Sequence, residues 1–123
     1  MSKPESLMVD DVRYVREDSI NRPADKLDGK PFVIIRSYGA GVFAGYLAER
    51  NDETRVVKLD RCIRLWRWTG CSLSQVANDG IAGTGENKFS APTDGHEILQ
   101  VIEIIPCTEK ARRAIQGVQP WKL

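Results

Sequence analysis

The chain has 123 residues, a formal net charge of +1 and an isoelectric point near 7.7. This length is typical of one domain with a modest core, close to the size at which oligomerisation often adds buried surface. The near-neutral charge argues against a protein that coats duplex nucleic acid through many phosphate contacts. Any anion-binding site is therefore expected to be local.

The cysteine pattern and the lengths of the apolar runs indicate in which cellular compartment the protein is expected. Cys62, Cys71 and Cys107 are odd in number and contain no C-x-x-C pair, and the first residues lack the apolar run of a signal peptide. The apolar runs 32–35 and 98–105 are shorter than the roughly 20 residues that a membrane helix needs. We predict a reduced, soluble, cytoplasmic protein with no membrane partner.

The first thirty residues differ from the rest of the chain. Acidic and basic side chains alternate closely in Met1–Lys30 around a thin apolar series, and Pro23–Gly29 has the composition of a linker. We predict an arm or linker over residues 1–30 and a single ligand-binding domain over residues 31–123.

Extended segments dominate the next part of the chain. A β-branched run at Phe32–Ile35 precedes a glycine-containing turn at Ser37–Gly41, and a polar turn follows at Arg50–Glu53. The predicted strands around these turns form an antiparallel meander: Phe32–Ile35, Val42–Leu47, Arg55–Leu59 and Arg61–Trp68.

Two helix starts carry capping residues. Ser72 precedes an apolar-periodic segment with Gln75 at the capping-box position, and Gly80 closes this helix. Thr108 caps a second helix over Glu109–Gln116, with an acid in its first turn.

A long polar loop and a strand separate the two helices. Gly80–Gly95 is rich in turn-forming residues, and a loop of this length usually binds a ligand or moves. The strand at Ile98–Ile105 is expected to stop at Pro106. The predicted fold class is α+β, a small antiparallel sheet with two short helices. Because two short helices cannot cover both faces of a sheet, we expect an oligomer.

Arginines and tryptophans alternate in the predicted strand Arg61–Trp68. Arg64, Trp66 and Trp68 present the guanidinium groups and flat rings that a nucleotide-shaped ligand needs. The alternative is a half-buried strand with both tryptophans in the core and the arginines in water.

Two further features are open to two interpretations. Arg36 stands beside the Gly39-Ala40-Gly41 turn, which is either an anion cradle or a plain hairpin turn. Phe89 lies in a polar segment and either plugs the core or offers its face to a ligand.

Catalytic patterns are weak. His96 is the single histidine and has no second metal ligand at suitable spacing, so we expect no metal site and no cofactor. The cysteines and serines lack a nucleophile motif, and the paired acids Asp52 and Glu53 fit an exposed turn. These features favour a binding protein over an enzyme.

Four motifs together resemble a known family. Ile35–Val42, Arg61–Gly70, Ser72–Ser74 and Glu103–Glu109 resemble the small phage proteins of the first Thoeris anti-defence type, and the likeness runs from about Pro31 to Val118. Members of that family are sponges that bind the cyclic ADP-ribose isomers made by bacterial TIR-domain enzymes and keep them from the immune effector. The resemblance implies a protein of the host bacterial cytoplasm that is not an enzyme.

The resemblance also implies partners and site residues. The family forms homodimers with pockets at the subunit interface, and some members form hexamers that also take cyclic oligonucleotides at separate sites. Arg64 and Phe89 would sandwich the adenine, while Arg36, its turn and one of two C-terminal arginines would hold the pyrophosphate. The full implied set is Arg36, Ser37, Tyr38, Gly39, Ala40, Gly41, Arg64, Asn87, Phe89, Arg112 and Arg113.

Two alternatives belong to other functional classes. A phosphodiesterase could cleave the same signal, although His96 lacks a base partner and a metal cluster is missing from the sequence pattern. A single-stranded nucleic-acid module could use Trp66, Trp68 and Phe89 as a stacking platform, against which the near-neutral charge argues.

Overall fold

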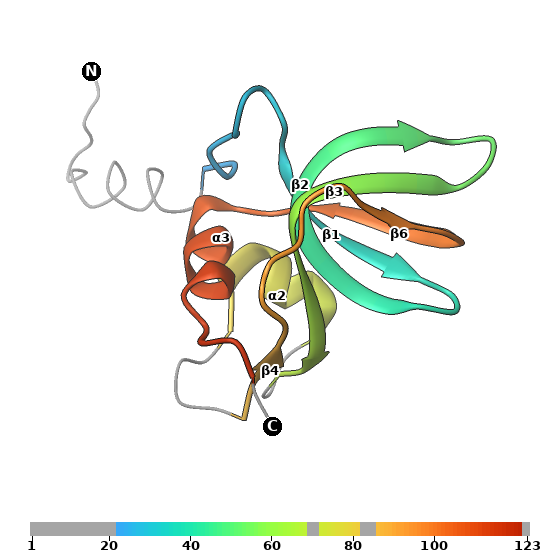
Figure 1. Cartoon of the computed structure of the whole chain (residues 1–123). Coiled ribbons are helices and arrows are strands. Elements are labelled where there is room, and N and C mark those ends of the chain that lie inside the picture. Colours follow the sequence, from blue (N-terminus) through green and yellow to red (C-terminus); the bar gives the residue numbers. More distant parts are fainter. Residues whose placement is uncertain (1–21, 69–71, 82–85, 122–123) are drawn as a thin grey trace, which may run out of the picture.

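The computed structural model describes residues 22–68, 72–81 and 86–121 (Figure 1). Most of the predicted arm, together with Cys71, lies outside the described residues. The described part of the chain contains six strands and two helices. They are β1 (Phe32–Ser37), β2 (Gly41–Asn51), β3 (Val56–Arg67), α2 (Leu73–Asp79), β4 (Lys88–Phe89), β5 (His96–Ile98), β6 (Val101–Pro106) and α3 (Glu109–Gln116).

The strands form one antiparallel sheet in the order β4-β3-β2-β1-β6, with β5 also paired to β3. Successive hairpins join β1, β2 and β3, so the predicted meander is confirmed. The α+β class and the two short helices are confirmed as well. None of the helices among the described residues is long and apolar enough to span a membrane.

The strands differ from the prediction at several places, and β2 runs on to Asn51. The two segments expected around Asp60 form the single strand β3, because the chain bulges there instead of ending, with Arg61 at φ 49°. The strand expected at Ile98–Ile105 is divided at Gln100, whose φ is 57°. The strand does end at Pro106, which is the last residue of β6 and pairs with Val33, whereas the expected loop contains β4.

Both predicted helix caps are confirmed. The Ser72 side chain accepts a hydrogen bond from the Gln75 amide at 3.3 Å, and Thr108 accepts one from Ala111 at 3.1 Å. Gly80 ends α2 at φ 81°, and a Cβ at this position would lie 2.6 Å from the Cβ of Ala114 in α3. Glycine therefore allows both the turn and the close contact between the helices.

The sheet has two apolar faces. Alternate residues of β1 divide between them: Phe32 and Ile34 face the helices, whereas Val33 and Ile35 face the other way. In Figure 1 both helices lie on one side and the strand hairpins extend to the other. We call these the helix-covered face, built by Phe32, Ile34, Ala44, Tyr46, Ile63, Leu65, Val76, Ala77, Phe89, Cys107, Ala111 and Ile115, and the open face, built by Val33, Ile35, Phe43, Val57, Leu59, Cys62, Ile98 and Val101.

Candidate ligand-binding site

Arg64 lies across an aromatic ring on the open face. Phe43 and Arg64 are directly paired in the β2–β3 ladder, and the guanidinium carbon sits 4.6 Å from the centre of the ring. Arg64 also donates from Nη1 to the carbonyl oxygen of Ala40 at 3.0 Å. The sheet therefore holds this cation beside the β1–β2 turn with one of its faces against an aromatic ring.

The β1–β2 turn is tied to the segment before β6. Ser37 is buried; its hydroxyl donates to the carbonyl of Leu99 at 2.6 Å and accepts from the amide of Ala40 at 3.3 Å. The amide of Tyr38 donates to the carbonyl of Gln100 at 2.9 Å. Because the amides of Tyr38 and Ala40 are already hydrogen-bonded, the turn does not present these two N–H groups to an anion.

The side chains of this turn differ in exposure. The Tyr38 side chain projects into solvent and is 82% exposed. Gly41 has φ 105°, which explains a glycine at this position. A Cβ on Gly39 would lie 2.8 Å from Oε1 of Gln100. Hydrogen bonds therefore hold the backbone of the turn in place, and the Tyr38 ring is exposed on it.

Arg36 lies on the opposite face of the sheet from Arg64. Residues paired across a ladder point to the same face, and Arg36 pairs with Val42, which packs against the helix-covered core. Its Nε donates to Oε1 of Glu103 in β6 at 2.8 Å. A single copy of the chain does not bring Arg36 and Arg64 together on one face.

Phe89 is a core residue. It pairs with Leu65, is 1% exposed and belongs to the helix-covered core, so the core-plug interpretation describes this structure. Arg64 is next to Leu65 in the strand and points to the other face, so the expected sandwich of Arg64 and Phe89 is not formed within one copy. Asn87, two residues before Phe89, is half-buried.

The tryptophans of β3 separate as well. Trp66 is exposed and contacts Trp121 edge to face at 5.9 Å between ring centres, whereas Trp68 packs partly buried against the helix-covered core. The sequence suggested that both rings lie in the core or that both form a stacking platform. Neither interpretation describes this pair, because one ring is exposed and the other is partly buried.

The two C-terminal arginine candidates are bound to a buried acid. Glu109 has a side chain only 2% exposed and accepts from Nε of Arg112 at 2.8 Å, from Nε of Arg113 at 2.8 Å and from the amide of Asp25 at 2.8 Å. The hydrogen bonds from Arg112 hold the pKa of the Glu109 carboxyl well below its usual range, and the same contact raises the pKa of Arg112. Arg113 remains largely exposed, so it is the member of the pair with donors left for a ligand.

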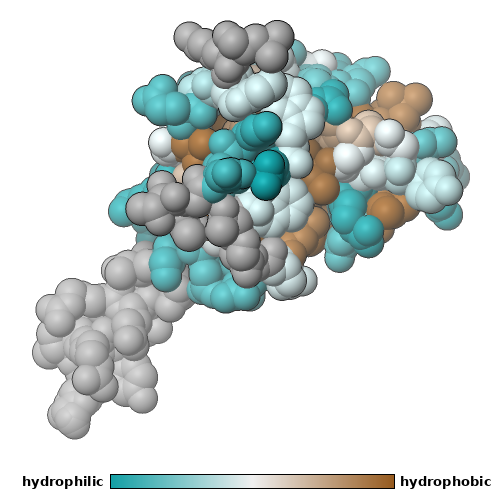
Figure 2. Space-filling model, turned by 90° about the horizontal axis from the view of Figure 1, so that it is seen from below, coloured by the Kyte–Doolittle hydropathy of each residue, from teal (hydrophilic) through white to brown (hydrophobic). Residues whose placement is uncertain are grey.

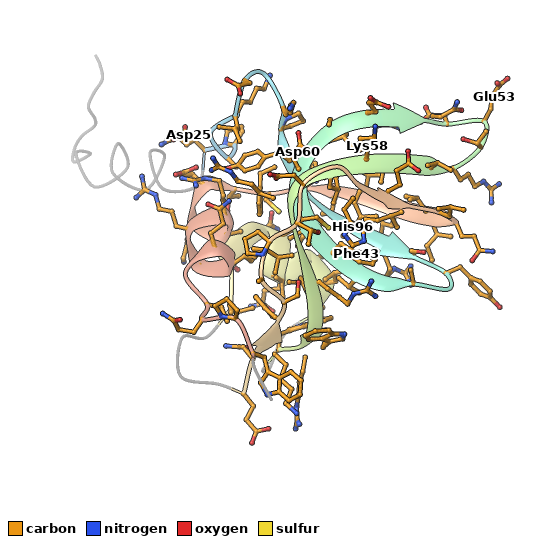
Figure 3. The ribbon with its side chains drawn as sticks, in the orientation of Figure 1. Asp25, Phe43, Glu53, Lys58, Asp60 and His96 are labelled. Atoms are coloured by element: carbon orange, nitrogen blue, oxygen red, sulfur yellow. The ribbon has the colours of Figure 1, made fainter. Side chains whose placement is uncertain are left out.

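His96 packs against an aromatic ring, and Cys62 and Cys107 are buried free cysteines. His96 lies beside Phe43, with ring centres 5.4 Å apart, and its Nδ1 is 2.8 Å from Oγ1 of Thr93 (Figure 3). Burial raises the pKa of the Cys62 and Cys107 thiols to about 12, so both remain protonated at neutral pH. Residues 22–68, 72–81 and 86–121 contain no group of three or more side chains placed to hold a metal ion.

The structure adds two features that the sequence did not indicate. The first is Phe43, whose place in the sequence indicates only a strand and whose ring packs against one face of the Arg64 guanidinium. In addition, a cleft of about 750 Å³ opens between β6 and the β2–β3 hairpin. It is lined by Pro31, Val33, Leu47, Arg50, Asn51, Asp52, Arg55, Val57, Val101, Ile102, Glu103, Ile104 and Pro106.

Comparison with known proteins places the chain in a family. Residues 30–115 match the family described as Domain of unknown function (DUF6948). The chain belongs to this family. The matched region covers β1 through most of α3 and includes Arg36 and Arg64. No curated protein and no solved structure matches the chain.

Proposed function

We propose that the chain binds cyclic ADP-ribose-type signalling nucleotides, such as glycocyclic ADP-ribose, and holds them without cleavage. In this proposal it is a phage sponge that blocks Thoeris immunity. The observation that supports it best is the Arg64 guanidinium, laid on Phe43 beside the exposed end of the β1–β2 hairpin. The motifs around Arg36 and Arg64 that resemble the phage anti-defence proteins point to the same ligand class.

The ligand offers what this arrangement recognises. A cyclised ADP-ribose carries two phosphates and a purine face. A guanidinium has two faces; Phe43 covers one face of Arg64, and we place the base on the other. The exposed ring of Tyr38 replaces Phe89 as the second stacking surface in this proposal, since Phe89 is buried.

The phosphates are assigned to Arg36 and Arg113. Arg36 forms an exposed ion pair with Glu103, which contributes roughly 0 to 1 kcal/mol and can be exchanged for a phosphate. Charge-assisted hydrogen bonds contribute about 1.5 to 3 kcal/mol each, and a stacked base about 1 to 3 kcal/mol. Four such contacts at the upper end of these ranges total about 12 kcal/mol, which is the free energy of the nanomolar binding that a stoichiometric sponge requires.

We place the pocket between two copies of the chain. Arg36 and Arg64 lie on opposite faces of the sheet, so they reach one ligand more readily from different subunits than from one. The proposed assembly is a homodimer, or a hexamer made of three dimers that also takes cyclic oligonucleotides at separate sites. Exposed apolar side chains outside the β6 cleft, at Tyr38, Trp66, Leu99 and Trp121, offer contact surface for such an assembly.

Calorimetry with purified cyclic ADP-ribose isomers tests the proposal. Arg64→Ala should weaken binding at least about tenfold, equivalent to about 1.4 kcal/mol. The matched control is Arg67→Ala, which removes an exposed arginine of the same strand that pairs with Glu86 and should leave affinity unchanged. Equal affinity of wild type and Arg64→Ala would remove Arg64 from the site.

The chemical state of the ligand separates the proposal from its rivals. Mass spectrometry after denaturing the complex should recover the cyclic nucleotide intact. A hydrolysed product would instead identify a phosphodiesterase. Binding of single-stranded oligonucleotides that is lost in Trp66→Ala, without binding of the cyclic nucleotide, would identify a nucleic-acid module.

A further inference from the structure

The cleft beside β6 has an aliphatic lining. Val33, Leu47, Val57, Val101 and Ile104 all belong to the open face or pack against it, and the cleft volume of about 750 Å³ lies within the range of small-molecule sites. Ile102, also in the lining, is 46% exposed. Seen from below, hydrophobic residues reach the surface on the side of the molecule that holds β1, β2 and β6, between hydrophilic patches (Figure 2). The cleft can therefore receive an apolar group of several carbon atoms.

In the described part of the chain, one arginine at this cleft has no ion-pair partner, whereas the other charged side chains of the lining are paired. Arg50 donates to Asp52 at 2.8 Å, and Glu103 accepts from Arg36 at 2.8 Å. Among the described residues, the Arg55 guanidinium has no hydrogen-bond or ion-pair partner, and it also lines the cleft. An occupant with a single negative charge would complement it.

Arg55 has a left-handed backbone conformation, which is strained for arginine but not for glycine. Arg55 closes the β2–β3 hairpin with φ 60°, and its amide donates to the carbonyl of Asn51 at 2.8 Å. The carbonyl of Arg55 accepts from the amide of Val101 at 3.0 Å, which fixes the residue at the start of β6. A left-handed conformation costs a side-chain-bearing residue roughly 1 kcal/mol or more, whereas glycine adopts it readily. An arginine at such a position supports a ligand-binding use for its side chain.

We propose that this cleft binds an amphipathic monocarboxylate, with its alkyl chain on the aliphatic lining and its carboxylate on Arg55. The lining contains no aromatic ring that would favour a stacked base, which separates this site from the one at Arg64. A guanidinium pairs with a carboxylate through two parallel hydrogen bonds. Glu53 at the tip of the same hairpin (Figure 3) points away from the strands and does not line the cleft.

The test uses octanoate as the probe and octanol as its uncharged match, titrated into the full chain and followed by amide NMR shifts. Octanoate should shift amides of the cleft-lining residues and bind at least about tenfold more tightly than octanol. Arg55→Gly should lose at least about tenfold in octanoate affinity while remaining folded, because glycine suits its φ. Arg61→Gly is the matched control: it removes an arginine with φ 49° outside the cleft and should bind octanoate like the wild type.

Three results would overturn this inference. They are unchanged octanoate affinity in Arg55→Gly, equal affinity for octanoate and octanol, and a concentration-dependent dimer that covers the cleft-lining amides and excludes octanoate. None of these results depends on Arg64, so failure here leaves the proposed nucleotide site standing.

Discussion

The two faces of the sheet differ in what covers them and in how their charged side chains are paired. On the helix-covered face α2 and α3 bury Phe89, and every oxygen of the Glu109 carboxylate is hydrogen-bonded. The open face has no helix over it among the described residues, carries Arg64 on the surface of Phe43, and ends in a cleft with an unpaired arginine. The buried Glu109 carboxylate beside the helices stabilises the fold, whereas Arg64 and Arg55 on the open side keep donors for a ligand.

The largest expected effect tests the assignment of Phe89 to the core. Phe89→Ala should lower the free energy of unfolding by about 3 to 5 kcal/mol, because it removes a fully buried ring and leaves a cavity. Tyr38→Ala, the exposed aromatic control, should change it by about 0.5 kcal/mol or less but weaken nucleotide binding. Urea denaturation and calorimetry measure the two effects. A stable Phe89→Ala protein that has lost only ligand affinity would return Phe89 to the binding site.

The next effect compares two ion pairs. Glu109→Gln should destabilise the fold by about 3 kcal/mol, since it leaves Arg112 half-buried without its partner charge. Glu103→Gln breaks the exposed pair with Arg36 and should cost less than about 1 kcal/mol. Urea denaturation of both variants gives the comparison, and equal losses would show that burial of the Glu109 carboxylate does not increase the contribution of its ion pairs.

The loss of folding stability at acidic pH should depend on Glu109. Its pKa is lowered in the folded chain from an ordinary value of 4.5, so its contribution is complete above that value and is lost as the pH falls toward the folded pKa. Stability of the wild type should therefore decline from about pH 4.5 downward, and Glu109→Gln should show a shallower decline. Chemical denaturation across this range decides the matter; parallel curves for the two proteins would assign the acid sensitivity to other carboxyls.

The smallest effect concerns backbone strain on the open face. Arg55→Gly should keep or raise stability by roughly 0.5 to 1 kcal/mol, because it relieves a left-handed arginine. Arg61→Gly, at φ 49°, should behave alike. Thermal unfolding measures both variants. A clear loss of stability in Arg55→Gly alone would mean that its side chain packs structurally and is not held ready for a ligand.

Local signals predicted much of the fold. The β-branched run at Phe32–Ile35, the caps at Ser72 and Thr108 and the closing Gly80 each act within a few residues, so the sequence displays them directly. The bulge at Arg61 and the division of the strand at Gln100 depend on pairing partners far away in the chain. Those features were therefore missed.

The site was harder to predict because a face assignment depends on register. Arg36 and Arg64 look equivalent as exposed strand arginines, and only the pairing with Val42 and Phe43 places them on opposite faces. The partner of Arg112 and Arg113 was present in the sequence as Glu109, one turn earlier on the same helix, and this spacing could have revealed the pairing. The cleft lies between β6 and the β2–β3 hairpin, which are far apart in the sequence, so no local pattern encodes it.

The most direct test of the proposed function is native mass spectrometry of the full chain with cyclic ADP-ribose isomers. A shared pocket predicts an even number of chains per complex, and release under denaturing conditions should return the ligand at its original mass. A ligand-loaded monomer would contradict the shared pocket, while a hydrolysed ligand or no uptake at all would contradict the sponge.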